Sequence, residues 1–286
     1  MWIFLNDGFV RKEDAMVSVF DHGFLYGDGV YETLRAYGGR LFRLRQHLAR
    51  LRRSASLIGL EVPIVEQDLI AVLQEAMKRN NLTDAYLRIT VSRGEGAIGL
   101  DPRLCARPTV VVISLPLQPY PAELFNTGVS LAIMNVRRNL ATALPPMIKS
   151  LNFLNNILAK QEASRAGAFD GLMLNAEGHI TECTTSNIFF VKNRCVHTPS
   201  AACGILDGIT REIVLSLARE QEFPTEEGRY LPNALLEADE CFLTNTTMEI
   251  MPVRDIDKRP IGNEKPGPVT GRLRELFRAN LPRFLE

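Results

Sequence analysis

The sequence has few cysteines, and their positions do not match any common framework. Five cysteines occur among 286 residues, and no two of them have the CxxC spacing. An odd count at scattered positions argues against a disulfide scaffold and supplies no recognisable ligand set for structural zinc. We therefore expect a protein of a reducing compartment, the cytoplasm, and we predict no metal site.

The sequence also lacks a long apolar run, a leader peptide and an excess of charge of one sign. No apolar stretch approaches the roughly 18 residues that span a bilayer, and the N-terminal MWIFLNDGFV lacks the basic start of a signal peptide. Lys plus Arg and Asp plus Glu both number 33, so the formal net charge is zero. This balance argues against nucleic acid or an anionic membrane as the main partner. A soluble protein with a sizeable core is expected.

Several catalytic motifs are missing as well. The sequence contains no P-loop, no HEXXH and no GxSxG, which removes support for nucleotide hydrolysis, zinc proteolysis and serine hydrolysis. GEGAIG at residues 94–99 matches GxGxxG, but Pro102 and Pro108 follow where a dinucleotide site needs a long helix. We therefore interpret residues 92–108 as a loop.

The first part of the chain combines strands with two helices. Apolar residues alternate or cluster in strand-like segments, and Gly38-Gly39 is typical of a hairpin turn. Helical spacing of apolar residues then takes over for two long segments. The predicted strands are 2–5, 16–20, 30–37, 41–44, 85–92 and 109–115, and the predicted helices are 44–60 and 65–79.

Three prolines between Pro116 and Pro121 mark a linker, after which the pattern restarts. We predict two α+β domains, residues 1–120 and 121–286, and pockets often form at such junctions. Beyond the linker, the predicted strands are 128–136, 170–174, 179–181, 188–192 and 240–244, and the predicted helices are 152–166, 208–220 and 272–280.

Four local patterns could contribute to chemistry. Lys149, in PPMIKSLNF, is either a partly buried nucleophile or an ordinary surface lysine. Glu182 ends the strand-like GHITE and either faces a cleft or lies in a turn. GILDGITRE begins a helix whose free N–H groups could bind phosphate, and LTNTTMEI offers clustered hydroxyl groups, although helix caps routinely use the same residue types.

The order of the motifs adds a resemblance to these local signals. DHGFLYGDGVYETLR, HLARL, IKSLNFLNNILAKQEA, HITECTTSNIFFV, GILDGITRE and LTNTTMEIMPV follow one another between Asp21 and Val253. Together they resemble the class IV pyridoxal-phosphate enzymes, which include branched-chain and D-amino-acid aminotransferases and aminodeoxychorismate lyases. The resemblance implies an α+β fold of fold type IV, with a small α/β N-terminal domain and a larger C-terminal domain that has a β-barrel-like core.

The resemblance also implies roles for individual residues. Lys149 matches the lysine that carries pyridoxal 5′-phosphate, and Glu182 matches the carboxylate that pairs with the pyridine nitrogen and supports its role as an electron sink. Arg50 matches the arginine that binds the cofactor phosphate, and Leu206 matches the residue packed under the ring. The other implied cofactor contacts are Ile209, Thr210, Thr246 and Thr185. The implied substrate contacts are Tyr26, Tyr31, Arg35, Tyr86, Arg88, Thr247 and Met248.

Three segments favour the branched-chain enzymes within this family. Tyr86-Leu87-Arg88 resembles their Tyr-x-Arg strand, in which the arginine holds the distal carboxylate of the acceptor. Residues 94–102 resemble their glycine-rich interdomain loop, and residues 136–146 resemble their basic loop before the lysine. Phe153 stands where many of them have tyrosine, and Arg35 is unusual, so a D-amino-acid aminotransferase and a lyase remain alternatives.

The implied activity is transfer of an amino group from leucine, isoleucine or valine to 2-oxoglutarate by a ping-pong mechanism. Its partners are amino acids and 2-oxo acids, and the implied assembly is a homodimer or a larger homo-oligomer. A non-catalytic scaffold with the same fold would lack the lysine or the carboxylate, whereas Lys149 and Glu182 are both present.

Overall fold

A computed structural model describes residues 1–263 and 265–286, and the chain divides into two compact units. Unit 1 comprises Met1–Gln118, Ile148–Phe153 and Phe284–Glu286, and unit 2 comprises Pro119–Met147 and Leu154–Arg283. The short segment that carries Lys149 therefore packs with the N-terminal part of the chain, although it follows the linker in sequence. None of the described helices is both long enough and apolar enough to cross a bilayer.

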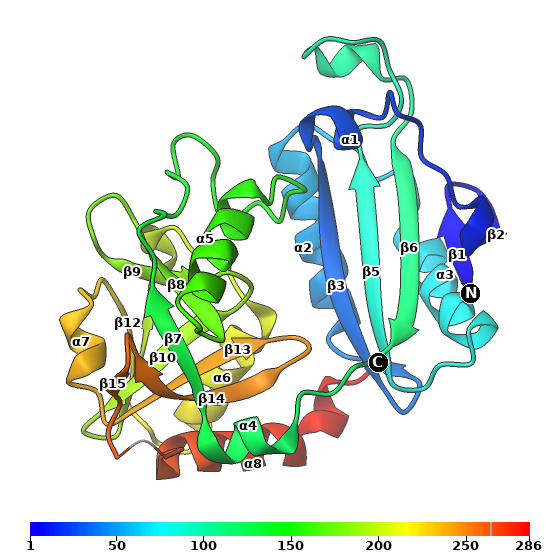
Figure 1. Ribbon diagram of the computed structural model, residues 1–286. Coiled ribbons are helices and arrows are strands. Elements are labelled where there is room, and N and C mark those ends of the chain that lie inside the picture. Colours follow the sequence, from blue (N-terminus) through cyan, green and yellow to red (C-terminus); the bar gives the residue numbers. More distant parts are fainter. Residues whose placement is uncertain (264) are drawn as a thin grey trace. The chain divides into compact units, whose positions relative to one another are not determined.

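Unit 1 is a six-stranded sheet with two helices on one face (Figure 1). The strands lie in the order β2-β1-β6-β5-β3-β4, and α2 and α3 pack against β3, β1 and β6. Their bounds are β1 (Trp2–Leu5), β2 (Gly8–Arg11), β3 (Gly29–Tyr37), β4 (Arg40–Leu41), β5 (Ala85–Ser92), β6 (Thr109–Pro116), α1 (His22–Tyr26), α2 (Leu44–Leu57) and α3 (Glu66–Arg79), with 3₁₀ turns at Lys12–Asp14 and Pro102–Leu104.

The alternation of side chains along β3 explains why the sheet of unit 1 has two different faces. Val30, Leu34 and Ala36 are fully buried and belong to the core that includes Leu48 and Leu51 of α2. Burying each of these larger apolar side chains contributes about 1.5–3 kcal/mol to folding. Tyr31, Thr33 and Arg35 point to the opposite face, which is therefore available for polar chemistry.

Unit 2 contains a closed ring of strands. The strand order β10-β13-β14-β7-β8-β9 closes because β9 also pairs with β10, and β11 and β12 extend the sheet beyond β10. This ring confirms the predicted barrel-like core. The strands are β7 (Val129–Ile133), β8 (Asp170–Leu174), β9 (Ile180–Cys183), β10 (Asn187–Lys192), β11 (Cys195–Pro199), β12 (Thr225–Gly228), β13 (Glu240–Asn245), β14 (Glu249–Ile256) and β15 (Arg259–Pro260).

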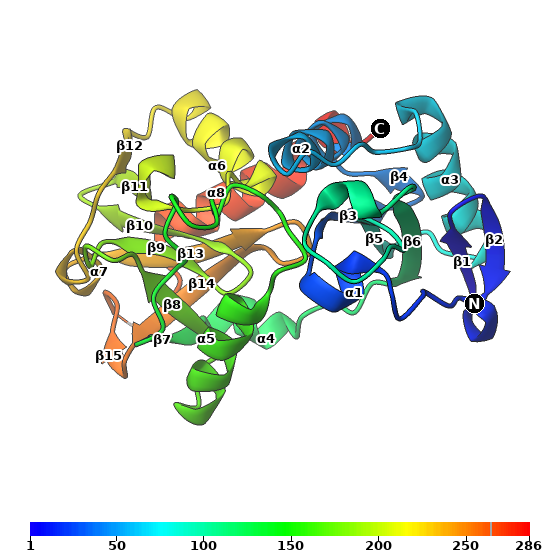
Figure 2. The same cartoon turned by 90° about the horizontal axis from the view of Figure 1, so that it is seen from above.

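Helices pack around the ring of unit 2 in Figure 2. Helix α5 packs on β8 and β7, while α6 and α8 lie side by side and pack on β13. The helices are α4 (Ala122–Thr127), α5 (Leu154–Arg165), α6 (Ile209–Glu220), α7 (Asn233–Leu236) and α8 (Pro268–Ala279), with 3₁₀ turns at Ala201–Cys203 and Leu281–Phe284.

The structure corrects some of the predicted elements. Residues 16–20 form no strand, because no neighbouring strand pairs with them, and Val17 and Val19 are exposed there. The Asp21 side chain then accepts a hydrogen bond from Gly23 N and begins α1, which the periodicity did not indicate. β2, β11, β12 and β14 were also missed. They are short or carry polar residues or a proline, so their pairing depends on neighbouring strands.

Candidate active site

Lys149 is held against β3 and α2 within unit 1. Its carbonyl oxygen accepts a hydrogen bond from Tyr31 N at 2.9 Å, and its own N–H donates to Ser54 Oγ at 3.1 Å. The side chain is half-buried, and its Nζ lies 4.4 Å from the centre of the Tyr31 ring. The backbone on both sides of the residue is therefore anchored, which fixes the direction in which the amine leaves the chain.

Four of the predicted substrate residues share one face of the β3–β5 pair. Thr33 is paired with Arg88, and Arg35 is paired with Tyr86. Cross-strand partners point to the same side of a sheet. The Tyr86 hydroxyl lies 3.5 Å from Thr33 Oγ1. Tyr31 belongs to this face as well, because it is two residues before Thr33 in the strand.

Arg88 is the cation closest to the Tyr31 ring on this face. Its guanidinium carbon lies 4.0 Å from the ring centre, and its Nε donates to Thr90 Oγ1 at 3.2 Å. Lys149 contacts the same ring, and Phe153 packs beside it with a centroid distance of 5.1 Å. Tyr31 therefore positions two cations, and each cation–π contact contributes about 0.5–2 kcal/mol.

Tyr26 and Arg35 have other neighbours within unit 1. The Tyr26 hydroxyl accepts a hydrogen bond from Gly99 N at 3.2 Å. Helix α1 therefore contacts the glycine-rich loop of residues 94–102. The Arg35 guanidinium lies 4.0 Å from the centre of the Tyr37 ring.

Arg50 lies in a buried cluster on the core face of the same sheet. Its Nε and Nη2 donate to Glu32 at 2.6 and 2.9 Å, and His47 Nδ1 lies 2.8 Å from the same carboxylate. Burial by itself would raise the pKa of Glu32, but the positive charge of Arg50 and the hydrogen bonds hold it well below its usual range. Burial also lowers the pKa of His47. Sequence reasoning missed Glu32 and His47, although positions 47 and 50 are one helical turn apart.

Both carboxylate oxygens of Glu182, in unit 2, have partners. Arg138 Nε donates to its Oε1 at 3.0 Å, and Arg138 Nη2 forms an ion pair with the same oxygen at 2.9 Å. Leu206 N and Asn187 Nδ2 donate to Oε2 at 3.0 and 3.3 Å. Glu182 and Asn187 are also the residue pair through which β9 closes the ring onto β10. The carboxylate is therefore buried and fixed in direction.

Arg138 is a candidate functional residue that sequence reasoning missed. It is only 9% exposed, and its Nη1 donates to Asn155 and Asn156 of α5 at 3.2 and 3.4 Å. A buried cation needs such a set of partners. The sequence contains the signals for this cluster, which are Arg138 in VRRNLATALPP and Asn155 and Asn156 in SLNFLNN. Their proximity to Glu182 arises only in the folded chain.

The start of α6 has the features of a phosphate site. Thr210 is 2% exposed, and its Oγ1 has no hydrogen-bond partner among the described residues. The helix begins after Gly208 without a side-chain cap, and its first-turn amides and dipole favour an anion. A buried hydroxyl without a partner costs about 1–3 kcal/mol. A ligand with acceptor oxygens would remove this cost, so Ile209 and Thr210 fit a cofactor phosphate.

The turn between β13 and β14 presents a second set of amides. Asn245 Oδ1 accepts hydrogen bonds from Thr247 N at 3.1 Å and from Met248 N at 2.7 Å. Thr246 is half-buried in the same turn, and the exposed Thr185 accepts from Asn245 Nδ2 at 3.3 Å through its carbonyl. In this structure the amides of Thr247 and Met248 therefore both bind the side-chain oxygen of Asn245.

Comparison with known proteins identifies the family. Residues 29–256 match the model of class IV aminotransferases. The chain belongs to this family. It is 44% identical over 278 residues to a protein of Methanocaldococcus jannaschii provisionally assigned as a branched-chain-amino-acid aminotransferase, with 97% of this chain and 96% of the relative covered. Members of the family use pyridoxal 5′-phosphate, and the protein is an aminotransferase dependent on this cofactor.

Relatives with other activities are also similar. An aminodeoxychorismate lyase of Bacillus subtilis is 33% identical over 285 residues, covering 99% of this chain and 96% of its own. A D-alanine aminotransferase of Bacillus licheniformis is 37% identical over 270 residues, covering 94% and 93%. Among solved structures, the branched-chain amino acid aminotransferase of Escherichia coli has a TM-score of 0.95 at 32% identity, covering 98% of this chain and 94% of its own.

Proposed function

We propose that this aminotransferase moves the amino group of leucine, isoleucine or valine to 2-oxoglutarate, with Lys149 as the cofactor lysine. The observation that carries the proposal is the composition of one sheet face in unit 1. Arg88 and Thr90 of β5 are paired with Ile113 and Val111 of β6, respectively. The side chains of Ile113 and Val111 are partly exposed. A cation beside aliphatic side chains suits an enzyme that binds two kinds of substrate in turn. The donor has an apolar side chain, and the acceptor has a distal carboxylate.

The proposed chemistry divides between the two units. Bound pyridoxal phosphate supplies the electron sink that makes the substrate Cα–H acidic. Lys149 Nζ accepts the proton from Cα and returns it in the reverse half-reaction, as a general base and acid. Glu182, which forms an ion pair with Arg138, would hold the pyridine nitrogen of the cofactor, and Leu206 would pack under its ring.

The phosphate is proposed to bind at the start of α6. Ile209 and Thr210 supply an amide and the buried hydroxyl, and Thr246 and Thr185 complete the set from neighbouring turns. For Arg50 the support is the family resemblance, because its Nε and Nη2 donate to Glu32 in this structure.

The substrate carboxylate is proposed to replace Asn245 Oδ1 at the amides of Thr247 and Met248. Those amides already converge on one carboxamide oxygen at hydrogen-bond distance. Tyr26, Tyr31, Arg35 and Tyr86 surround the remainder of the substrate in this proposal, with Arg88 reserved for the distal carboxylate of the acceptor.

A comparison of amino donors tests the substrate assignment. With 2-oxoglutarate as acceptor, kcat/KM is expected to be highest for L-leucine, L-isoleucine or L-valine, because Ile113 and Val111 lie beside Arg88. D-Alanine and 4-amino-4-deoxychorismate serve as the competing substrates. Faster turnover of D-alanine would establish the D-amino-acid alternative, and release of pyruvate from 4-amino-4-deoxychorismate at a higher rate would establish the lyase.

Arg88→Ala is expected to separate the acceptor from the donor. Loss of a charged hydrogen bond to a carboxylate costs about 1.5–3 kcal/mol, so kcat/KM for 2-oxoglutarate should fall roughly 10- to 100-fold. The half-reaction with L-leucine should change much less. Arg53→Ala, at an exposed position of α2, is the matched control. Equal losses in both half-reactions would show that Arg88 does not hold the acceptor carboxylate.

A homodimer or a larger homo-oligomer in the cytoplasm is also part of the proposal. Unit 1 exposes large apolar side chains, with Met16 74%, Phe24 73% and Leu100 83% exposed, as expected of a surface that another subunit covers. All five cysteines are free thiols. Light scattering on the holoenzyme should give at least twice the 32.0 kDa chain mass, whereas a monomer at micromolar concentration would contradict this assembly.

A further inference from the structure

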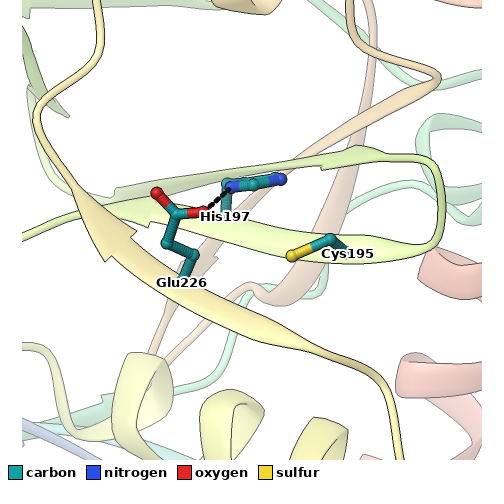
Figure 3. Close-up of side chains that lie close together, drawn as sticks. All are labelled: Cys195, His197 and Glu226. Carbon is teal, nitrogen blue, oxygen red and sulfur yellow. Dashed lines mark ion pairs between the residues drawn. The ribbon is translucent and has the colours of Figure 1, made fainter.

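Three side chains with metal-binding atoms meet at the edge of the sheet in unit 2, on two strands that carry none of the predicted cofactor residues. Cys195 and His197 lie on β11, two residues apart, so they point to the same face of the strand. Glu226 lies on β12, directly paired with His197 in parallel register. Figure 3 shows the three side chains directed toward one another across the two strands.

The distances among these atoms are near those of a metal site. His197 Nδ1 and Glu226 Oε2 are 3.6 Å apart, and all three candidate ligand atoms lie within 4.8 Å of one another. Zinc bonds of about 2.0–2.3 Å in a tetrahedron place ligand atoms roughly 3.3–3.8 Å apart. The histidine–glutamate pair already has this spacing. The remaining two separations, from Cys195 Sγ to the other two ligand atoms, need to shorten by up to roughly 1 Å. The Glu226 side chain, 60% exposed, has room to make part of this movement.

The aromatic surroundings hold the imidazole in place. The His197 ring stacks on Phe190 with a centroid distance of 4.8 Å and an angle of 13°, and Tyr230 packs against its edge. The Tyr230 hydroxyl is 3.3 Å from Nδ1 and donates a hydrogen bond to the backbone carbonyl oxygen of Glu226 at 3.3 Å, so it links the two strands beside the imidazole. Partners of this kind orient the first ligands in established metal sites.

The protonation of the ligands also bears on binding. Burial lowers the pKa of His197, against the charge of Glu226, which raises it. Burial and the charge of Glu226 raise the pKa of Cys195, so a metal ion must displace the thiol proton.

We propose that Cys195, His197 and Glu226 form a binding site for one divalent cation of zinc-like preference. Thiolate, imidazole and carboxylate are the donors that zinc accepts, with water at the fourth position. The ion would join β12, the last strand of the nine-stranded sheet, to β11, its neighbour in the strand order. The site stabilises the sheet edge. The sequence predicts no metal site because the register of β11 and β12 is not evident in it.

Cobalt provides a direct test on the holoenzyme, purified without a histidine tag. One equivalent of Co²⁺ per chain should produce the intense d–d bands of tetrahedral cobalt in the red part of the spectrum, outside the cofactor absorbance, and Zn²⁺ should remove them. Zn²⁺ alone should also raise Tm, since a ligand that binds only the folded state stabilises it.

Matched variants locate the ion. Cys195→Ser and His197→Gln should abolish the cobalt bands, and Glu226→Gln, at an exposed side chain that folding tolerates, should weaken binding about 10-fold or more. Cys105→Ser and His179→Gln should leave the bands unchanged, and transamination should be unaffected in Glu226→Gln. No bands in the wild-type protein, bands that persist in His197→Gln and Cys195→Ser, or bands lost in Cys105→Ser would overturn the proposal.

Discussion

Replacing Lys149 with alanine is expected to remove the visible absorbance band of the holoenzyme and nearly all transamination. The amine is the group that binds the cofactor covalently and also moves the Cα proton. Loss of a general acid–base group alone costs about 10²–10⁴-fold in rate. The absorbance spectrum and the leucine half-reaction, both measured with excess pyridoxal phosphate, should show the two losses together.

Lys78→Ala is the control for this experiment, because Lys78 is an exposed lysine on α3. Its spectrum and rate should match those of the wild-type protein. The anchors of Lys149 are backbone contacts to Tyr31 N and Ser54 Oγ, and the alanine variant retains the backbone atoms that make them. The variant should therefore fold, and normal activity in it would show that another residue carries the cofactor.

Glu182→Gln is expected to have the second largest effect. The glutamine keeps the size of the side chain but removes the negative charge that faces Arg138 and, in the proposal, the pyridine nitrogen. Removal of a preorganised electrostatic contact to the reacting system costs roughly 10²–10³ in kcat. A buried arginine without its partner also destabilises the fold by about 3–5 kcal/mol.

Two measurements separate these effects. Single-turnover rates at saturating cofactor report on the chemistry, and Tm in the absence of the substrate reports on the fold. Arg138→Lys keeps a positive charge near Glu182 and should retain more activity than Glu182→Gln. Glu177→Gln, at an exposed turn position, should change neither quantity. A full rate in Glu182→Gln, accompanied only by a lower Tm, would assign Glu182 a purely structural role.

The parts of the fold that follow local rules were predictable. β5 and β8 have the predicted bounds, because β-branched residues define β5 and the turn at residues 175–178 marks the end of β8. α3 begins one residue later than predicted and ends where expected. β11 and β12 were not predicted, because a four- or five-residue strand at a sheet edge is stabilised mainly by its pairing.

The candidate site shows the same division. Lys149 and Glu182 are identifiable in the sequence through the motif order, but Arg138 is not, because it lies 44 residues before Glu182 and reaches it only across the folded unit 2. The cluster of Glu32, His47 and Arg50 likewise needs the alternation of β3 and the pitch of α2 to coincide. These contacts between residues distant in sequence depend on tertiary packing, which local sequence patterns do not predict.

Reduction of the holoenzyme with borohydride, followed by peptide mass spectrometry, tests the central assignment most directly. The reagent converts the cofactor linkage into a stable phosphopyridoxyl–lysine, so the modified residue can be identified. The account predicts a single modified peptide containing PPMIKSLNF, with the label on Lys149. A label on any other lysine, or no label on a holoenzyme that is active, would contradict it.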